Sequence, residues 1–267
     1  MKPTVEVLIS CMHQKDTSII ERTNIQSDVV VVNQCDVDKI EEFDFINKRG
    51  ETCHAKFIST RERGLSRSRN MAIRNASGDI CLICDDDEIL KDDYPQLILD
   101  TYNSNIKCDF ITFNIAIAER QFPNKKLKVG YIRALKTASW QITFIRNTII
   151  RQGINFDVEM GAGITLGGSE ENRFLFDCLN VGLKGIYTPT VIGTVHTVNS
   201  TWAVTKDNFP RYFKDRGCAY RKLMGPFIGS LYILYSSFRK YSQYTNYCSF
   251  LTSIKLQFDG MLKKPKI

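Results

Sequence analysis

The stretch ASGDICLICDDDEIL, residues 76–90, places an apolar run of strand length directly before four consecutive acids. The run DICLIC follows a Ser-Gly turn, which is typical of a short buried strand. Acids crowded at the end of such a strand repel one another unless a cation lies among them. Carboxylate oxygens suit Mg²⁺ or Mn²⁺, which would hold a diphosphate, so Asp85, Asp86 and Asp87 form a candidate metal and phosphate site. The alternative is an acidic N-terminus of the helix that follows.

Further strands are predicted on the N-terminal side of this stretch. VEVLIS (5–10), DVVVVN (28–33) and KFIS (56–59) are short and flanked by polar turns, and helical patterns cover residues 65–75 and 94–102. Strands that alternate with helices predict an α/β fold, a mostly parallel sheet with helices on both faces. Ligands then belong at the carboxyl ends of the strands. Beyond a basic loop at 120–128, we expect strands at 131–135 and 141–145.

A basic segment, RERGLSRSRN at residues 61–70, lies between two of these strands. Gly64 would form a turn into a helix that carries Arg69 and Asn70, and helix N-termini attract phosphate. Arginine makes fork-like contacts with phosphate, so this segment and the acids together predict a site for a cation and a phosphate. Read alone, the segment is a solvated basic helix.

Two further features lie in the second half of the chain. A glycine-rich run at 161–168 precedes Ser169, an expected N-cap, and the acids Glu170 and Glu171. One of these carboxylates could act as a general base, although acids in a first helical turn are common for dipole reasons alone. His196 follows a strand-like run and is either a structural turn residue or a metal ligand.

The charge of the chain is unevenly distributed. Residues 205–267 hold 12 Lys/Arg and 3 Asp/Glu, a net charge of +9, whereas residues 1–204 carry −2. In this tail an apolar stripe runs at helical spacing through Tyr244, Tyr247, Leu251, Ile254, Phe258 and Met261. The stripe predicts either a buried face or contact with an anionic membrane surface. No apolar run reaches the length that spans a bilayer.

The nine cysteines are scattered, and no leader sequence precedes the first strand, so we expect a cytoplasmic protein. Cys81 and Cys84 lie in the strand-like run without a second Cys/His pair, which favours buried core residues over a zinc or redox site.

The order of these motifs resembles that of family-2 GT-A glycosyltransferases of the kind that makes bacterial surface polysaccharides. The resemblance covers residues 5–202 and is carried by VVVVNQCD, GLSRSRNMAI, ASGDICLICDDDEIL and GGSEENRFLFDCLN. It implies a GT-A domain at 1–204 and leaves a helical, basic extension at 205–267.

The resemblance also assigns roles to residues. Asp85 and Asp87 stand at the DXD positions, with His196 completing a site for Mn²⁺ or Mg²⁺, and Glu171 and Glu170 stand at the positions of the base and the acceptor-binding acid. The expected nucleotide-binding residues are Ser10, Asn33, Asp36, Gly64, Arg69, Asn70, Asp85 and Asp86. The sequence VNQCD stands where the family usually has a pair of acids that contact the nucleobase and ribose, and this chain departs from the family there.

The implied activity is an inverting, metal-dependent hexosyl transfer from a nucleotide-sugar, expected to be UDP-linked. The acceptor would be a hydroxyl of a glycan or lipid-linked glycan, in capsular, exopolysaccharide or O-antigen synthesis, on the inner face of the cell membrane. Nucleic acid is not an expected partner. The alternatives are a nucleotidyltransferase, whose glycine-rich signature is absent after the first strand, and an inactive nucleotide-sugar-binding protein.

Overall fold

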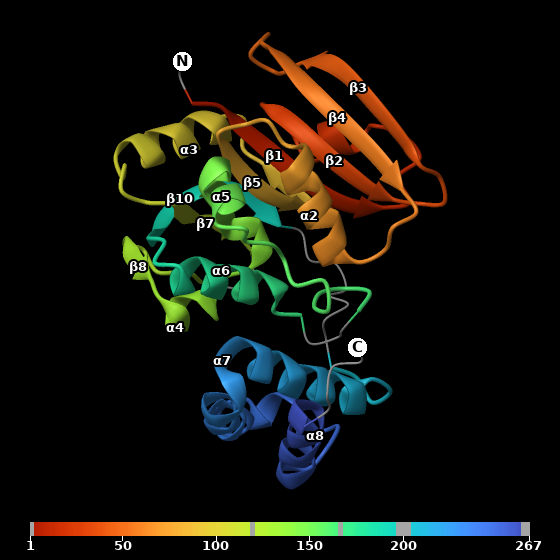
Figure 1. Ribbon diagram of the computed structural model, residues 1–267, viewed down its shortest axis with the longest axis vertical. Coiled ribbons are helices and arrows are strands. Elements are labelled where there is room, and N and C mark those ends of the chain that lie inside the picture. The colour runs from red at the N-terminus through yellow and green to blue at the C-terminus, as the bar shows by residue number, and fades with distance from the viewer. Residues whose placement is uncertain (1–2, 118–120, 165–167, 196–203, 263–267) are drawn as a thin grey trace.

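The computed structural model describes residues 3–117, 121–164, 168–195 and 204–262. Figure 1 shows a twisted sheet with helices on both faces, and a pair of C-terminal helices on one side of this body. The described strands are β1 (Val5–Met12), β2 (Asp28–Gln34), β3 (Lys39–Ile46), β4 (Thr52–Thr60), β5 (Ile80–Asp85), β6 (Glu88–Leu90), β7 (Phe110–Ala116), β8 (Leu127–Val129), β9 (Ile142–Ile145) and β10 (Gly185–Val195).

The described α-helices are interspersed among these strands up to β10, and helices alone follow it. They are α1 (Ile19–Arg22), α2 (Leu65–Asn75), α3 (Tyr94–Asn103), α4 (Tyr131–Ala134), α5 (Arg146–Arg151), α6 (Glu170–Asn180), α7 (Phe209–Arg239) and α8 (Phe250–Leu262). Two 3₁₀ turns, η1 (Ser139–Gln141) and η2 (Tyr241–Gln243), complete the described elements.

The strands form one mixed sheet in the order β3-β4-β2-β1-β5-β9-β7-β10-β6, with β8 paired to β10. β4, β2, β1 and β5 run parallel, and so do β7 and β10. β9 runs antiparallel to both of its neighbours, and β3, β6 and β8 are antiparallel edge strands. The predicted α/β fold with a mixed sheet is therefore confirmed.

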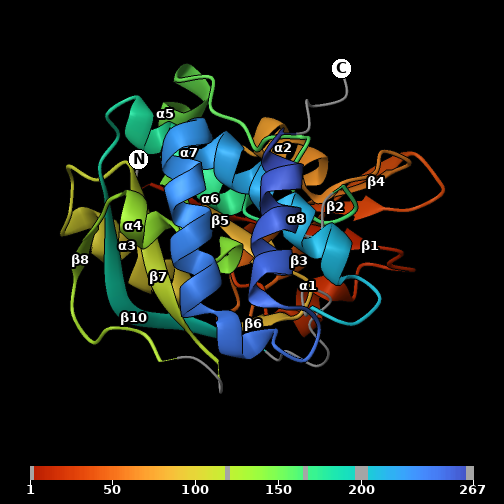
Figure 2. The ribbon, with the colours of Figure 1, turned by 90° about the horizontal axis from the view of Figure 1, so that it is seen from below.

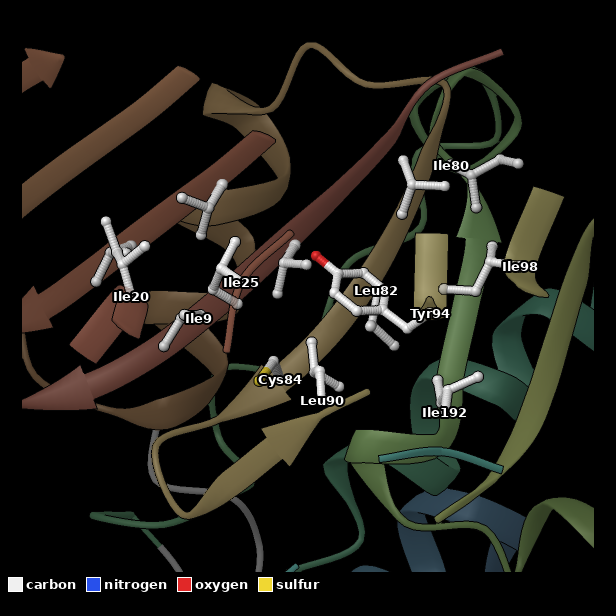
Figure 3. Close-up of a cluster of buried hydrophobic side chains, with 14 of the residues drawn as sticks. Ile9, Ile20, Ile25, Ile80, Leu82, Cys84, Leu90, Tyr94, Ile98 and Ile192 are labelled. Atoms are coloured by element: carbon white, nitrogen blue, oxygen red, sulfur yellow. The ribbon is translucent and has the colours of Figure 1, made fainter. Parts of the chain in front are cut away.

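Side chains of the central strands point alternately to the two faces of the sheet, and apolar residues cover both faces. On one face, side chains such as Ile9 and Leu82 pack with Tyr94 and Ile98 of α3, as Figure 3 shows. On the other face, residues such as Leu8 and Ile83 pack with α2, α5 and α6. Cys81 and Cys84 are both fully buried in β5, which confirms the prediction that they are core residues. The two cores fix the strand ends that carry the polar residues.

Two local predictions fail. Residues 131–135, predicted as a strand, form the short helix α4, because Tyr131 packs its ring edge-on against Phe176 of α6 and Ala134 is buried there. The edge strand β3 was not predicted, although its residues alternate between exposed and half-buried positions, and Phe43 and Phe45 pack against the core. The strand at Ile142–Ile145 and helix α2 agree with prediction.

The C-terminal helices α7 and α8 lie side by side, as Figure 2 shows from below. Glycines allow this approach: a Cβ on Gly217 would lie 1.8 Å from the Gln257 carbonyl oxygen, and one on Gly260 would lie 1.9 Å from that of Lys214. Gly225, with φ 73° and ψ 175°, interrupts α7 before Pro226. Within the described residues, each helix is too short or too polar to cross a membrane.

The apolar stripe predicted in the tail does not form one surface. Tyr244 and Met261 are buried, as a core role predicts, whereas Leu251 is 75% exposed. The reason is that Tyr244 lies directly after η2, and a turn at residues 244–247 separates it from α8, so the helical spacing is broken.

Candidate active site

The carboxyl ends of β1, β2 and β5 meet at one edge of the sheet. Ser10 pairs in register with Asp85 on one side and with Val32 on the other, one residue before Asn33. Ser10 is buried, and its hydroxyl oxygen accepts a hydrogen bond of 2.9 Å from Ser68 of α2. The predicted strand ends thus lie together with the start of α2.

A single arginine joins the acidic strand end to the start of α6. Arg69 is buried, with its side chain 1% exposed, and donates to Asp85 Oδ1 at 2.8 Å and to Glu170 Oε1 at 2.9 Å. The second oxygen of Asp85 accepts from the Ser139 hydroxyl at 3.0 Å. Because all three charged groups share one fork, the orientation of Asp85 is fixed relative to that of α6.

The acidic turn follows β5. Asp86 and Asp87 are exposed, and the loss of surrounding water together with repulsion from Asp85 raises the pKa of each. Glu88 is buried, and its Oε1 accepts the Asp85 backbone N–H at 2.9 Å. Burial and repulsion from Asp85 raise the pKa of Glu88 well above its ordinary value. The buried Glu88 therefore braces the turn through this backbone hydrogen bond, and within the described residues Asp86 and Asp87 form no ion pair.

The two acids at the start of α6 have different surroundings. Glu170 is buried, and its carboxylate is paired with Arg69, with Oε2 lacking a hydrogen-bond partner among the described residues. Glu171 is half-buried, and burial followed by repulsion from Glu170 raises its pKa to about 8. Ser169 is the N-cap residue of α6, as predicted, although its φ is 74° and its hydroxyl makes no capping hydrogen bond.

A cavity of about 390 Å³ opens beside these groups. One side of its wall is formed by Arg69, Asp85, Ser139, Trp140, Glu170 and Glu171. The opposite wall is formed by the C-terminal part of the chain, through Tyr212, Arg216, Tyr220, Tyr232 and Lys240. The enclosed volume can hold a sugar-sized group next to Glu171.

The remaining predicted nucleotide-binding residues have varied positions. The Asn33 amide is buried and bonds the backbone of Gln14 through both of its polar atoms, at 2.9 and 3.0 Å. The Asn70 amide likewise bonds both backbone groups of Phe156 at 2.8 Å. Both amides thus hold loops in place, and their side chains are already satisfied within the protein.

Two of those predicted residues are more open to a ligand. Asp36 has a side chain 88% exposed and forms an ion pair of 2.7 Å with Arg63. Gly64 stands at the N-cap of α2 with φ 116°, and its N–H donates to the Gln34 side chain at 2.7 Å. A left-handed φ of this size favours glycine, which explains its place in the basic segment.

The fit of a divalent cation depends on Asp85, Asp86 and Asp87. Within the described residues, His, Cys, Asp and Glu side chains do not gather in groups of three that could hold a metal ion, and His196 lies outside those residues. The exposed Asp87, whose pKa is raised by loss of surrounding water and by the nearby carboxylates, still fits a cation that takes its other ligands from a diphosphate and water. The donor set therefore suits a metal ion that shares its coordination with a bound anionic ligand.

The sequence interpretation missed the residues that form the far wall and the loop side of the cavity. Tyr212, Arg216 and Tyr220 recur every four residues on α7, a helical row of polar and aromatic groups that could have indicated a site. Ser139 and Trp140 carry no comparable signal, because η1 is too short for a periodic pattern.

A model of glycosyl transferase family 2 matches residues 13–164, more than half of the chain. The chain therefore belongs to glycosyl transferase family 2. The search of curated protein sequences found no match.

Several solved structures have the same architecture as this chain. S. aureus TarS 1–349 matches with a TM-score of 0.59 at 13% identity, over 97% of this chain and 90% of that one. Its complex with UDP-GlcNAc gives the same score and coverage at 12% identity. The mannosyltransferase PcManGT from Pyrobaculum calidifontis, in complex with GDP-Man and Mn²⁺, scores 0.57 at 16% identity, over 97% of this chain and 74% of that one. At these identities the likeness shows the fold, which is GT-A.

Proposed function

We propose that this protein transfers a sugar from a nucleotide-sugar to a hydroxyl group of a glycan or lipid-linked glycan, with inversion at the anomeric carbon. The observation that carries the proposal is the Arg69 fork, which places the strand-end Asp85 and the start of α6 around one cavity. Family membership and neighbours that bind UDP-GlcNAc and GDP-Man support a nucleotide-sugar donor. The TarS complex with UDP-GlcNAc supports UDP as the nucleotide. A role in surface polysaccharide synthesis, expected from the sequence resemblance, is part of the proposal.

Glu171 is the proposed general base. Its carboxylate lines the cavity and forms no ion pair within the described residues, whereas that of Glu170 is held by Arg69. Glu171 would take the proton of the acceptor hydroxyl as the oxygen attacks the anomeric carbon. Glu170 would act through Arg69 by positioning Asp85, in place of the acceptor contact that the sequence predicted.

The donor would lie along the ends of β1, β2 and β5. Asp85 and Asp87 would hold Mn²⁺ or Mg²⁺ at the diphosphate, and Mn²⁺ in the PcManGT complex supports this proposal. When bound, such a cation stabilises the negative charge of the departing nucleoside diphosphate. Ser10, Asp36 and Gly64 border the same edge of the sheet and would contact the nucleoside.

We treat residues 1–204 as the catalytic domain and 205–267 as an extension that would bind an anionic membrane surface. An apolar row on the second half of α7 supports the membrane contact: Phe227, Ile228, Leu231, Tyr235 and Phe238 are 55–80% exposed. The extension has a net charge of +9, and each basic group near an anionic leaflet contributes on the order of 1 kcal/mol. Such attachment would raise the local concentration of a lipid-linked acceptor.

The test of the enzymatic proposal is hydrolysis of a panel of nucleotide-sugars with Mn²⁺ or Mg²⁺. The expected result is slow, metal-dependent release of nucleoside diphosphate from one donor, and loss of at least about a hundredfold of that activity in Glu171→Gln. If every donor is bound but none is cleaved, the protein is a nucleotide-sugar-binding protein and the proposed activity is wrong.

A further inference from the structure

The C-terminal helix α7 is anchored on the catalytic domain and is therefore a fixed wall of the active-site cavity. Lys222 forms ion pairs with Asp157 at 2.9 Å and with Glu159 at 2.6 Å, and its carbonyl oxygen accepts a hydrogen bond from Arg173 of α6. Leu223 is buried in the core cluster below α6. The side chains that α7 presents to the cavity thus have set positions.

Arg216 is the central group of this wall. Its guanidinium donates to the Tyr212 hydroxyl at 2.9 Å and to the Tyr220 hydroxyl at 3.0 Å, and it lies 5.4 and 5.3 Å from the centres of the two rings. These partners fix the direction of the guanidinium but carry no negative charge. Within the described residues, carboxylates do not come within ion-pair distance of Arg216.

A second cation lines the same cavity at the end of α7. Lys240 forms no ion pair with a described carboxylate, and repulsion from Arg216, together with the loss of surrounding water, lowers its pKa to about 8. Two cations held together without an acid between them attract an anion, because binding one removes their mutual repulsion.

The position of this cation pair sets it apart from the expected nucleoside. Of the expected nucleotide-binding residues, Arg69 and Asp85 line the cavity beside Glu171, whereas those at the ends of β1 and β2, Ser10, Asn33 and Asp36, do not. Asp86 and Asp87 also lie outside its lining. An anion at Arg216 and Lys240 would therefore sit on the side of Glu171 from which the acceptor hydroxyl arrives.

We propose that Arg216 and Lys240 form a subsite for a phosphate or carboxylate group of the acceptor, so that the enzyme selects an anionic acceptor. The subsite rests on the proposed function, because it assigns the cavity beside Glu171 to the acceptor. A phosphate could also come from the diphosphate of the donor, and the experiment separates these two sources.

The experiment is calorimetric titration of inorganic phosphate into the full chain at constant ionic strength, with saturating UDP and Mg²⁺ occupying the donor side. The variant is Lys240→Gln, which alters an exposed side chain and leaves the Tyr212 and Tyr220 contacts of Arg216 in place. The control is Arg239→Gln, which removes another exposed cation, one residue earlier, that does not line the cavity. Lys240→Arg tests whether charge alone restores binding.

The expected result is a loss of roughly tenfold or more in phosphate affinity for Lys240→Gln, which corresponds to one charge-assisted contact. Arg239→Gln should bind phosphate as the parent does, and Lys240→Arg should recover most of the affinity. Equal affinities in Lys240→Gln and Arg239→Gln, or no measurable binding by the parent, would overturn the proposal.

A second titration, of UDP with Mg²⁺, tests whether the phosphate that the cation pair binds belongs to the donor diphosphate. If saturating UDP prevents phosphate binding and Lys240→Gln weakens UDP binding tenfold, the pair belongs to the donor diphosphate and the acceptor subsite is refuted. Failure of the enzymatic proposal would look different, since no nucleotide-sugar would be hydrolysed by the parent whatever the phosphate titration shows.

Discussion

Replacing Arg69 by methionine tests the arrangement on which the proposed active site depends. Removing the guanidinium leaves Glu170 as a carboxylate that is 4% exposed and has no countercharge. Loss of one partner from a buried ion pair costs about 3–5 kcal/mol. Asp85 should add little to this, because its side chain is 27% exposed and keeps its hydrogen bond to Ser139. In a chain of 267 residues the cost corresponds to a fall in Tm of roughly 5–9 °C.

Urea and thermal denaturation of three variants measure the effect. Arg67→Met is the matched control on the same helix, since Arg67 is 44% exposed and its surface pair with Glu62 contributes less than about 1 kcal/mol. Arg69→Met combined with Glu170→Gln should recover more than half of the lost stability, because the buried charge is then absent. A cost below about 1 kcal/mol for Arg69→Met, or no recovery in the double variant, would refute the reasoning.

Three further predictions concern the acids and the C-terminal surface. Because the pKa of Glu171 is raised to about 8, the rate of donor hydrolysis should rise with pH up to about 8. The contribution of Glu171 to the free energy of unfolding should fall as the pH rises from about 4.5 to about 8. A hydrolysis rate that stays flat between pH 6 and 8 contradicts this prediction. Asp87→Ala should abolish Mn²⁺-dependent binding of UDP in calorimetry while leaving the thermal unfolding curve unchanged, and parental affinity in this variant would exclude Asp87 as a ligand. Phe227→Ser with Phe238→Ser should weaken flotation with anionic liposomes at least about tenfold, whereas Ile106→Ser, at an equally exposed site, should not; absence of binding by the parent at low salt would rule out the membrane contact.

The sequence predicts those parts of the fold whose signals are local. The bounds of α2 agree at both ends, because Gly64 begins the turn into the helix and the Ala-Ser-Gly sequence follows it. β5 is recognisable since an apolar run ends abruptly in acids. By contrast, α4 has side chains that favour strands, and only its packing on α6 makes it helical. The exposed apolar row of α7 could not be identified from the sequence, because whether a helix face is covered by a neighbouring element depends on the tertiary structure.

The same difference between local and long-range signals applies to the candidate site. Asp85 and Glu170 can each be identified from neighbouring residues, yet their link through Arg69 joins positions 16 and 101 residues from it. Local patterns give no information on pairing at that separation, and for this reason Asn33 and Asn70 were grouped with ligand-binding residues although their amides bond nearby backbone.

The fork has a consequence for function, because Arg69 carries one charge between two carboxylates. A cation at Asp85 would compete with the guanidinium for that carboxylate and leave Arg69 more fully paired with Glu170. Donor binding at Asp85 would then strengthen the ion pair at the start of α6, the helix that carries the proposed base.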